Sequence, residues 1–187
     1  MKKSILAVVV LATGVFSAHA QTGNKSGEVT ANINLHKLQT LTINDQSVDI
    51  DFMTEDHYRT GASSEVLNDH MTISSTGAFV VNATAVHAVP NNGKSLGVAT
   101  SPLSITTSQG SANALDAQAQ YVSNKALVRG TTVVSSAVGQ FGKTVDVQYS
   151  ANTDAYINMN LIDRKFVTDD ESTNVYQVQV TYTIAVK

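Results

Sequence analysis

The sequence predicts an all-β fold, an antiparallel β-sandwich of the immunoglobulin-like kind with at most one short helical turn. Apolar and polar residues alternate with a period of two in several stretches, as they do in strands that bury one face. Turn residues separate these stretches roughly every ten residues, and helical spacing is nearly absent. No internal repeat suggests a propeller or a solenoid.

The alternation is clearest in residues 175–187. Glutamine and threonine dominate one parity, whereas the other carries six apolar side chains: Tyr176, Val178, Val180, Tyr182, Ile184 and Val186. Burying six such side chains contributes on the order of 10 kcal/mol before conformational entropy is subtracted. We therefore expect this strand to belong to the core.

Residues 1–20 have the pattern of a secretory signal peptide. Lys2 and Lys3 precede an apolar run over 5–16, which ends in small residues at Ala18 and Ala20. The run is shorter than the roughly 20 residues that a membrane-spanning helix needs. We expect cleavage before Gln21, no membrane span afterwards, and an exported protein in the periplasm, on the cell surface or secreted.

Charge and cysteine content narrow the class of protein further. Cleavage would remove two basic and no acidic residues, which changes the formal net charge from −3 to −5. A mildly acidic chain lacks the clustered basic footprint of nucleic-acid binding. There is no cysteine, so an exported fold must be stable without disulfides. The mature chain has the length of one domain.

We predict a flexible arm over 21–27 and a single sandwich over 28–187. Residues 28–35 form a second clean alternation, with Val29, Ala31, Ile33 and Leu35 on one face. Further strands are predicted around Leu41 and Ile43, around Val48, Ile50 and Phe52, around Met71 and Ile73, and over 79–86, 103–105, 131–138, 145–149 and 155–161. Residues 79–86 are apolar on both faces, which is typical of a central strand.

The connections are predicted from turn residues and from broken periodicity. Residues 54–69 are expected to form a long loop with one short strand near Tyr58. A turn is expected at 74–77 and a hairpin-like return over 90–98. The spacing in 108–124 fits a helical turn before a strand, and Gly139 and Gly142 predict a hairpin between 131–138 and 145–149.

No motif of a known catalytic or cofactor site is present. The chain has no glycine-flanked serine of the nucleophile-elbow type, no cysteine for thiol chemistry and no glycine-rich phosphate loop. We therefore predict a non-enzymatic protein without a cofactor. Four histidines follow the signal peptide without the close spacing of a zinc site, and we interpret them as surface or strand-edge residues: His36, His57, His70 and His87.

Other polar clusters receive structural interpretations. The densest carboxylate group could hold calcium, but it lacks a calcium-loop motif, so no metal is predicted: Asp49, Asp51, Glu55 and Asp56. A second acidic group, over 169–171, is interpreted as a solvated loop. The tyrosines of the predicted strands are interpreted as core residues with a peripheral hydroxyl. There is no tryptophan to line a sugar-cleaving site.

Taken together, the signal peptide, the short arm, the row from Val29 to Leu35, the strands rich in small polar residues and the final alternating strand resemble bacterial fimbrial-type, pilin-like β-sandwich subunits. The resemblance implies assembly by strand donation, in which one subunit's arm completes the sheet of the next. The absence of a disulfide departs from many chaperone-assembled pilins.

The expected function is a structural or adhesive subunit at the bacterial cell surface, with itself or another surface protein as partner. Its assembly strands would be 28–35 and the final strand. The alternative is a monomeric periplasmic or secreted binding module that recognises a glycan or a protein through its loops. If the two end strands complete one sheet, the protein is a closed monomer; if one is lent to a neighbour, it is a fibre.

Overall fold

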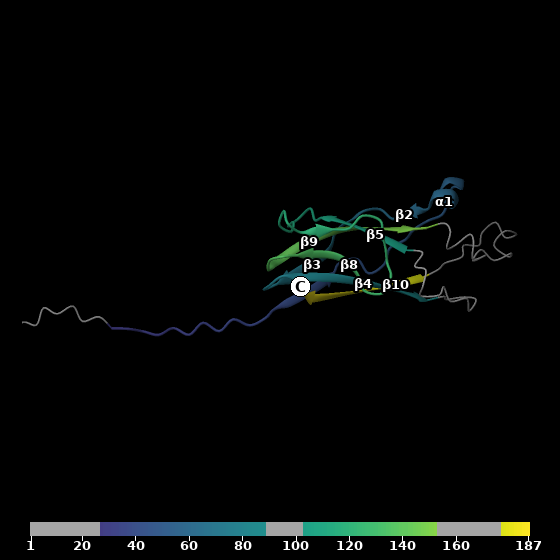
Figure 1. The fold of residues 1–187 in the computed structure, drawn as a ribbon. Coiled ribbons are helices and arrows are strands. Elements are labelled where there is room, and N and C mark those ends of the chain that lie inside the picture. The colour runs from purple at the N-terminus through teal and green to yellow at the C-terminus, as the bar shows by residue number, and fades with distance from the viewer. Residues whose placement is uncertain (1–26, 89–102, 153–176) are drawn as a thin grey trace, which may run out of the picture. The chain divides into compact units, whose positions relative to one another are not determined.

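A computed structural model describes residues 27–88, 103–152 and 177–187 (Figure 1). The chain divides into two units, Met1–Leu35 and His36–Lys187, and all described strands lie in the second. The elements are β1 (Gln39–Ile43), α1 (Glu55–Thr60), β2 (Ala62–Ser63), β3 (Leu67–Ser75), β4 (Phe79–Ala88), β5 (Leu103–Gln109), β6 (Gln120–Tyr121), β7 (Lys125–Ala126), β8 (Thr131–Ser136), β9 (Gln140–Ala151) and β10 (Gln177–Val186).

Two sheets make up the second unit, which confirms the predicted all-β sandwich. In one sheet the strands follow the order β1-β3-β9-β5-β7, with β2 also paired to β9. The other has the order β10-β4-β8-β6. Neighbouring strands are antiparallel throughout these pairings. In Figure 1, β9 and β5 lie in one layer and β4 and β10 in the other.

The core lies between the sheets and is built from the alternating apolar positions. Phe79, Val81 and Ala83 of β4 are fully buried, as are Met71 and Ile73 of β3. Successive strand side chains point to opposite faces, so every second residue reaches this core. The prediction of a central strand at 79–86 is confirmed, because β4 pairs with β10 on one side and β8 on the other.

One predicted loop and one predicted strand differ in the structure. Residues 55–60 form the short helix α1 instead of a loop with a strand, because the Thr54 side chain caps the helix by accepting a hydrogen bond from the His57 amide. Residues 48–52, predicted as a strand, alternate in burial but pair with no described strand. Neither feature has a sequence signal long enough to separate it from its alternative.

The predicted helical turn within 108–124 is reduced to one hydrogen-bonded turn directly before β6, in which the Ala119 amide donates to the Asp116 carbonyl over 3.1 Å. Residues 110–114 instead run beside β9, where Ala114 forms an isolated parallel bridge with Thr144. A side chain on Gly110 would overlap the backbone of Thr144, so the close approach requires glycine. The carboxylate of Asp69 secures this segment by accepting hydrogen bonds from the Ser111 hydroxyl and the Ala112 amide.

The predicted hairpin between 131–138 and 145–149 is wrong. The strands β8 and β9 are consecutive in the chain, but β8 pairs with β4 and β9 pairs with β3, so the connection crosses between the sheets. Gly139 in this connection lies so close to the Thr76 backbone that an added Cβ would be 2.5 Å from its carbonyl carbon. Turn residues reveal where a chain turns, but not which sheet it joins.

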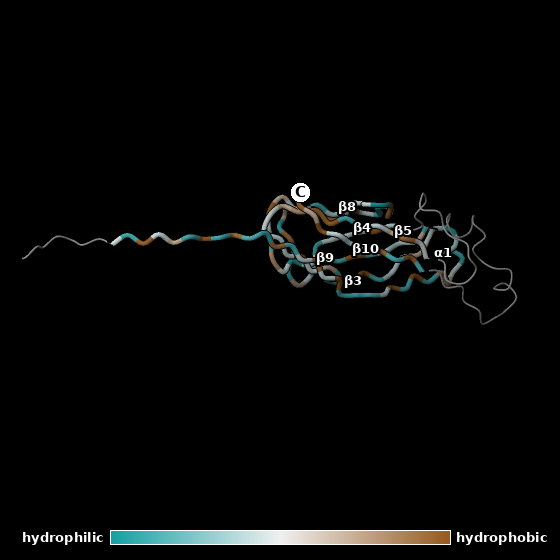
Figure 2. The backbone as a smooth tube through the Cα atoms, turned by 90° about the horizontal axis from the view of Figure 1, so that it is seen from below, coloured by the Kyte–Doolittle hydropathy of each residue, from teal (hydrophilic) through white to brown (hydrophobic). Residues whose placement is uncertain are grey.

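The first unit contains the predicted strand at 28–35, and there the structure has no strand. Val29 is 92%, Ile33 is 82% and Leu35 is 90% exposed. Figure 2 shows apolar and polar residues alternating along this segment. A one-sided strand needs a sheet edge to pair with and a core to cover, and none of the described strand pairings includes this segment.

Several predictions lie outside the described residues, namely the signal peptide, the return over 90–98, the row over 155–161, the acidic group over 169–171 and Tyr176. In the described part of the chain, no helix is long and apolar enough to cross a membrane.

Candidate functional site

The sandwich has an open side, which we define as the side where β1 and β10 each end a sheet. Among the described strands, β1 pairs only with β3, and β10 pairs only with β4. The two edge strands lie next to each other, one from each sheet. Backbone N–H and C=O groups along such edges can accept another strand.

The apolar face of β10 is incompletely covered. Its inward residues Val178, Val180, Tyr182 and Ile184 pack against the core, yet each stays partly exposed. On the neighbouring strand β4, by contrast, the inward side chains from Phe79 to Ala85 are buried. The difference arises because β4 has a strand on both sides, whereas β10 has a described strand on one side only.

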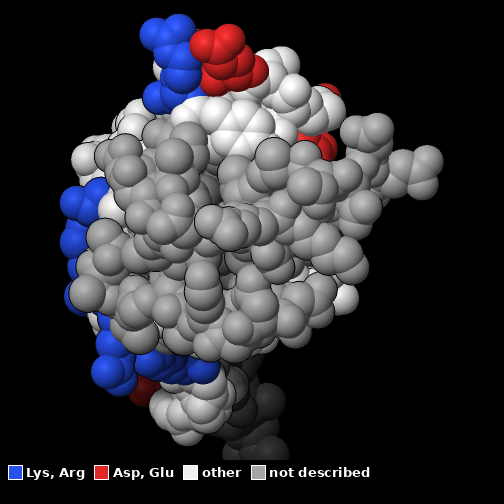
Figure 3. All heavy atoms as spheres, turned by 90° about the vertical axis from the view of Figure 1, so that its right-hand side faces the viewer, with Lys and Arg blue, Asp and Glu red and all other residues white. Residues whose placement is uncertain are grey.

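The facing edge has the same character. Leu41 and Ile43 of β1 are partly exposed and contact the same core, as do Val48 and Ile50 in the following segment. The open side therefore presents a partly covered apolar strip between two strand edges. Acidic residues occur in the same segments, because Asp45 follows β1 and Asp49 and Asp51 alternate with Val48 and Ile50. Figure 3 views a different face, the right-hand end of Figure 1, where the visible Lys and Arg residues lie towards the edge of the view.

The directions of β1 and β10 can be described relative to one end of the sandwich. The first residue of β1, Gln39, is opposite Ser75, and the last residue of β10, Val186, is opposite Phe79. Ser75 and Phe79 flank the turn between β3 and β4, so we call this the turn end. The chain enters β1 at the turn end, and β10 runs towards it.

A polar network lies in the core behind the open side. The His70 ring on β3 is 3.1 Å from the Asp45 carboxylate at Nδ1 and 3.3 Å from the Tyr149 hydroxyl at Nε2. The Tyr149 hydroxyl is in turn hydrogen-bonded to the Tyr182 hydroxyl. The network joins the residues after β1 to β3, β9 and the edge strand β10.

The hydrogen-bond partners define one consistent arrangement for a neutral imidazole. A carboxylate only accepts, so Nδ1–H donates to Asp45 and Nε2 accepts from the Tyr149 hydroxyl. Tyr149 can then accept from Tyr182, and every member has a partner. Burial raises the pKa of both tyrosine hydroxyls above the ordinary value, so both are neutral at physiological pH. Because His70 and Tyr149 are buried, this network ties strands together in the core, and it reaches solvent at the Asp45 side chain, which is 44% exposed.

Several site predictions change in the light of this geometry. His70 is buried in the core, so its interpretation as a surface or strand-edge residue is wrong. A bulge between Leu67 and Met71 is responsible, because it turns two consecutive residues, His70 and Met71, to the inside. The hydroxyls of Tyr149 and Tyr182 are internal hydrogen-bonding groups and not peripheral ones.

The calcium candidates are not assembled into a ligand cage. Asp49 and Asp51 are exposed in the segment before α1, and Glu55 and Asp56 occupy the first helical turn. Among the described residues, no group of three or more acidic, histidine or cysteine side chains has the proximity that a metal ion requires. Carboxylates at the start of a helix stabilise its positive end.

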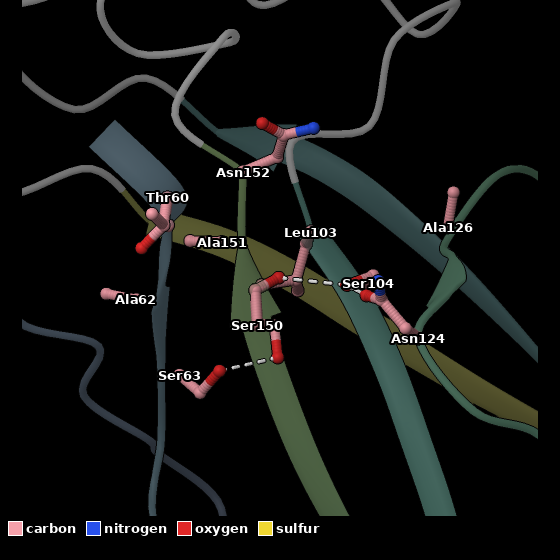
Figure 4. Close-up of a pocket in the computed structure, with 11 residues that line it drawn as sticks. Thr60, Ala62, Ser63, Leu103, Ser104, Asn124, Ala126, Ser150, Ala151 and Asn152 are labelled. Atoms are coloured by element: carbon pink, nitrogen blue, oxygen red, sulfur yellow. Dashed lines mark hydrogen bonds between the residues drawn. The ribbon is translucent and has the colours of Figure 1, made fainter. Parts of the chain in front are cut away.

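A second surface feature is a hollow at the C-terminal end of β9, lined by residues of β2 on one side of β9 and of β5 and β7 on the other. It has a volume of about 400 Å³ and is shown in Figure 4. Its polar lining is uncharged: Ser63 and Ser150 share a hydrogen bond of 2.8 Å, and the Ser104 hydroxyl donates to Asn124 over 2.6 Å. Ser104 and Ser150 lie on different strands, β5 and β9, and nothing in the sequence around either residue indicates that the two strands are paired at this point.

No known protein-family model matches the chain, and no curated protein matches its sequence. Neither comparison assigns a role to the open side, which is characterised by its own residues.

Proposed function

We propose that the protein is a non-enzymatic structural or adhesive subunit, exported to the bacterial cell surface, which assembles into fibres by strand donation. Residues 28–35 of one copy would occupy the open side of the next. One observation carries this proposal: among the described residues, the one-sided apolar segment 28–35 belongs to no sheet, and β10 pairs with a strand on one edge only. The resemblance to pilin-like subunits, the signal-peptide pattern and the sandwich fold all support it.

Strand direction favours donation to another copy over insertion into the same chain. Residues 28–35 join β1 at the turn end through His36, Lys37 and Leu38 only. To lie along its own β10, the segment would have to reverse at this connection and would then run parallel to β10. The segment of a second copy has no such constraint and can pair antiparallel, which is the slightly more stable arrangement.

Apolar burial supplies the driving force for the association. Each large apolar side chain moved from water to a core contributes about 1.5 to 3 kcal/mol. Val29, Ile33 and Leu35 are almost fully exposed in the single chain, and the partly exposed row of β10 would be covered in the same step. Part of this gain offsets the entropy lost on association.

The test is the association state of the purified chain beginning at Gln21. Refolded over a range of concentrations, it should form polymers that are detected by light scattering and electron microscopy. The double variant Val29→Ser/Ile33→Ser should remain monomeric, with an unchanged urea midpoint because these residues lie outside the sandwich strands. The matched control Thr30→Ser/Asn32→Ser changes the opposite face and should still polymerise. A wild-type chain that is monomeric in every condition, with no surface fibre lost on deletion, would refute the proposal.

The second candidate is a monomeric binding module for a glycan. The hollow in Figure 4 favours it, because uncharged hydroxyl and amide groups are suited to the hydroxyls of a neutral sugar. A glycan array with the mature chain tests this function. Hits that disappear in Asn124→Ala/Ser150→Ala, while the polymer-deficient variant retains them, would establish binding; an array without hits would exclude the sugars presented.

A further inference from the structure

We infer that Tyr182 sets the register of the donated strand: Ala31 of one copy lies opposite Tyr182 of the next. This inference rests on the proposed function and adds the specificity-determining pair. Residues 28–35 would run antiparallel to β10, with Val29 opposite Ile184, Ile33 opposite Val180 and Leu35 opposite Val178.

The first support is that the donor segment and β10 have the same number of apolar residues at the same alternating spacing. Four inward residues of β10 pack against the core and are partly exposed, and four apolar residues alternate in 28–35. Only this register covers all four. A shift of two residues towards the end of the strand would leave Val178 uncovered and place Val29 opposite Val186, which is 56% exposed and not part of the core cluster.

The second support is size. Tyr182 is the one aromatic residue among the four, and its ring is held in place by the hydroxyl bond to Tyr149 and by an edge contact with the His70 ring at 6.3 Å. A side chain fixed at both ring and hydroxyl cannot move aside to admit a bulky neighbour. Ala31 is the smallest of the four donor residues, and directly opposite side chains on paired strands are the ones that contact.

The outward face is compatible with this register. In the same register Thr30 is opposite Thr183, Asn32 is opposite Thr181 and Asn34 is opposite Gln179. These residues of β10 are exposed. Cross-strand pairs of hydroxyl and amide side chains can hydrogen-bond to each other, so polar residues meet polar residues at Thr30, Asn32 and Asn34, whereas Glu28 lies opposite Ala185. The competing register, shifted by two, would place Thr30 opposite Ala185 and Glu28 opposite Lys187, so the outward face is compatible with both registers and the inward face distinguishes them.

Disulfide trapping tests the register directly, because the chain has no native cysteine. Directly opposite residues of antiparallel strands have Cα atoms about 4.5 to 5.5 Å apart, within the range that a disulfide bridges, whereas a two-residue shift offsets them by about 7 Å along the strand and moves them out of that range. Chains carrying Asn32→Cys would be mixed, under mild oxidation, with chains carrying Gln179→Cys, Thr181→Cys or Thr183→Cys. All four positions are exposed, so the substitutions leave the core intact.

The inference requires covalent heterodimers with Thr181→Cys and not with the other two partners. Selective trapping with Thr183→Cys or Gln179→Cys would overturn the register and leave strand donation standing, as would polymers that trap with none of the three. If no trapping occurs and every mixture is monomeric, both the register and the proposed function are wrong.

A size variant tests the role of Tyr182 separately. Ala31→Phe should reduce the yield of the trapped heterodimer by about tenfold or more, because the added ring overpacks against Tyr182. The matched control is Ile33→Phe, which adds a ring opposite Val180 and should reduce it much less. Both changes lie outside the sandwich strands, so folding is unaffected. Equal losses, or a larger loss for Ile33→Phe, would overturn the role of Tyr182.

Discussion

The hydroxyl of Tyr149 on β9 is hydrogen-bonded to the hydroxyl of Tyr182 on β10, so a polar contact joins the two sheets inside the apolar core. Tyr149 also contacts His70, which reaches the Asp45 carboxylate. A fully paired network of this kind fixes the relative position of the strands that contribute to it. Here it positions the edge strand that borders the open side.

Removing the Tyr182 hydroxyl should therefore lower stability. Tyr182→Phe deletes one hydrogen bond and should decrease the free energy of unfolding by about 1 kcal/mol, measured by urea denaturation. Tyr121→Phe is the control, because the buried Tyr121 hydroxyl has no hydrogen-bond partner among the described residues; its removal should leave stability unchanged or slightly raised. A cost for Tyr121→Phe equal to that for Tyr182→Phe would contradict this assignment.

Alkaline pH should destabilise the fold through the same pair. Burial raises the pKa of Tyr149 and of Tyr182 above the ordinary value, so the folded state holds these protons more tightly than the unfolded state. The resulting stability is complete below the unfolded-state pKa of about 10 and is lost at higher pH, by up to about 1.4 kcal/mol per pH unit for each tyrosine. Unfolding free energies between pH 8 and pH 11 should show this loss, and Tyr182→Phe should reduce its slope. An unchanged slope would argue against the burial of this hydroxyl.

A charged side chain should lower the free energy of unfolding much more on the inward face of β10 than on its outward face. Val180 packs against the core, whereas Gln179 is exposed. Val180→Asp places an unpaired carboxylate against apolar side chains and should cost about 2 kcal/mol or more, whereas Gln179→Lys should change stability by less than about 0.5 kcal/mol. Urea midpoints measure both. Similar effects would mean that the faces are assigned wrongly.

The crossing between the sheets should depend on Gly139. Gly139→Ala would force its Cβ against the Thr76 backbone, and we expect a loss of about 1 to 3 kcal/mol. Gly77→Ala lies at the same turn end with no atom within 4 Å of the added Cβ, and it should be nearly neutral. Thermal denaturation of the two variants gives the comparison; a neutral Gly139→Ala would show that this connection can move away from Thr76.

The sequence could predict the parts of the fold that a two-residue period encodes. The fold class and the strands around Leu41, Met71, Phe79, Leu103 and Val180 follow from that period, because each buries one face of a sheet. The same period could not reveal that 28–35 has no sheet of its own in the single chain. Alternation indicates that one face of a segment is apolar, but it does not indicate which strand covers that face.

The polar network was not predictable for a different reason. His70 is buried because a bulge places it beside Met71 on the inner face, and a bulge inserts one residue without any marker in the sequence. Asp45, Tyr149 and Tyr182 then meet His70 from three other parts of the chain. Such long-range meetings depend on the order of strands in the sheets, which local patterns do not contain.

The pairing of β10 with β4 also has a consequence for the time course of folding. Phe79 pairs with Val186, and Ala88 with Gln177, so this sheet joins distant parts of the sequence. The entropy of closing so long a loop is lost before the strand contacts contribute any stabilisation, so such pairings form slowly. During synthesis the chain therefore stays unable to complete its core until the β10 residues emerge.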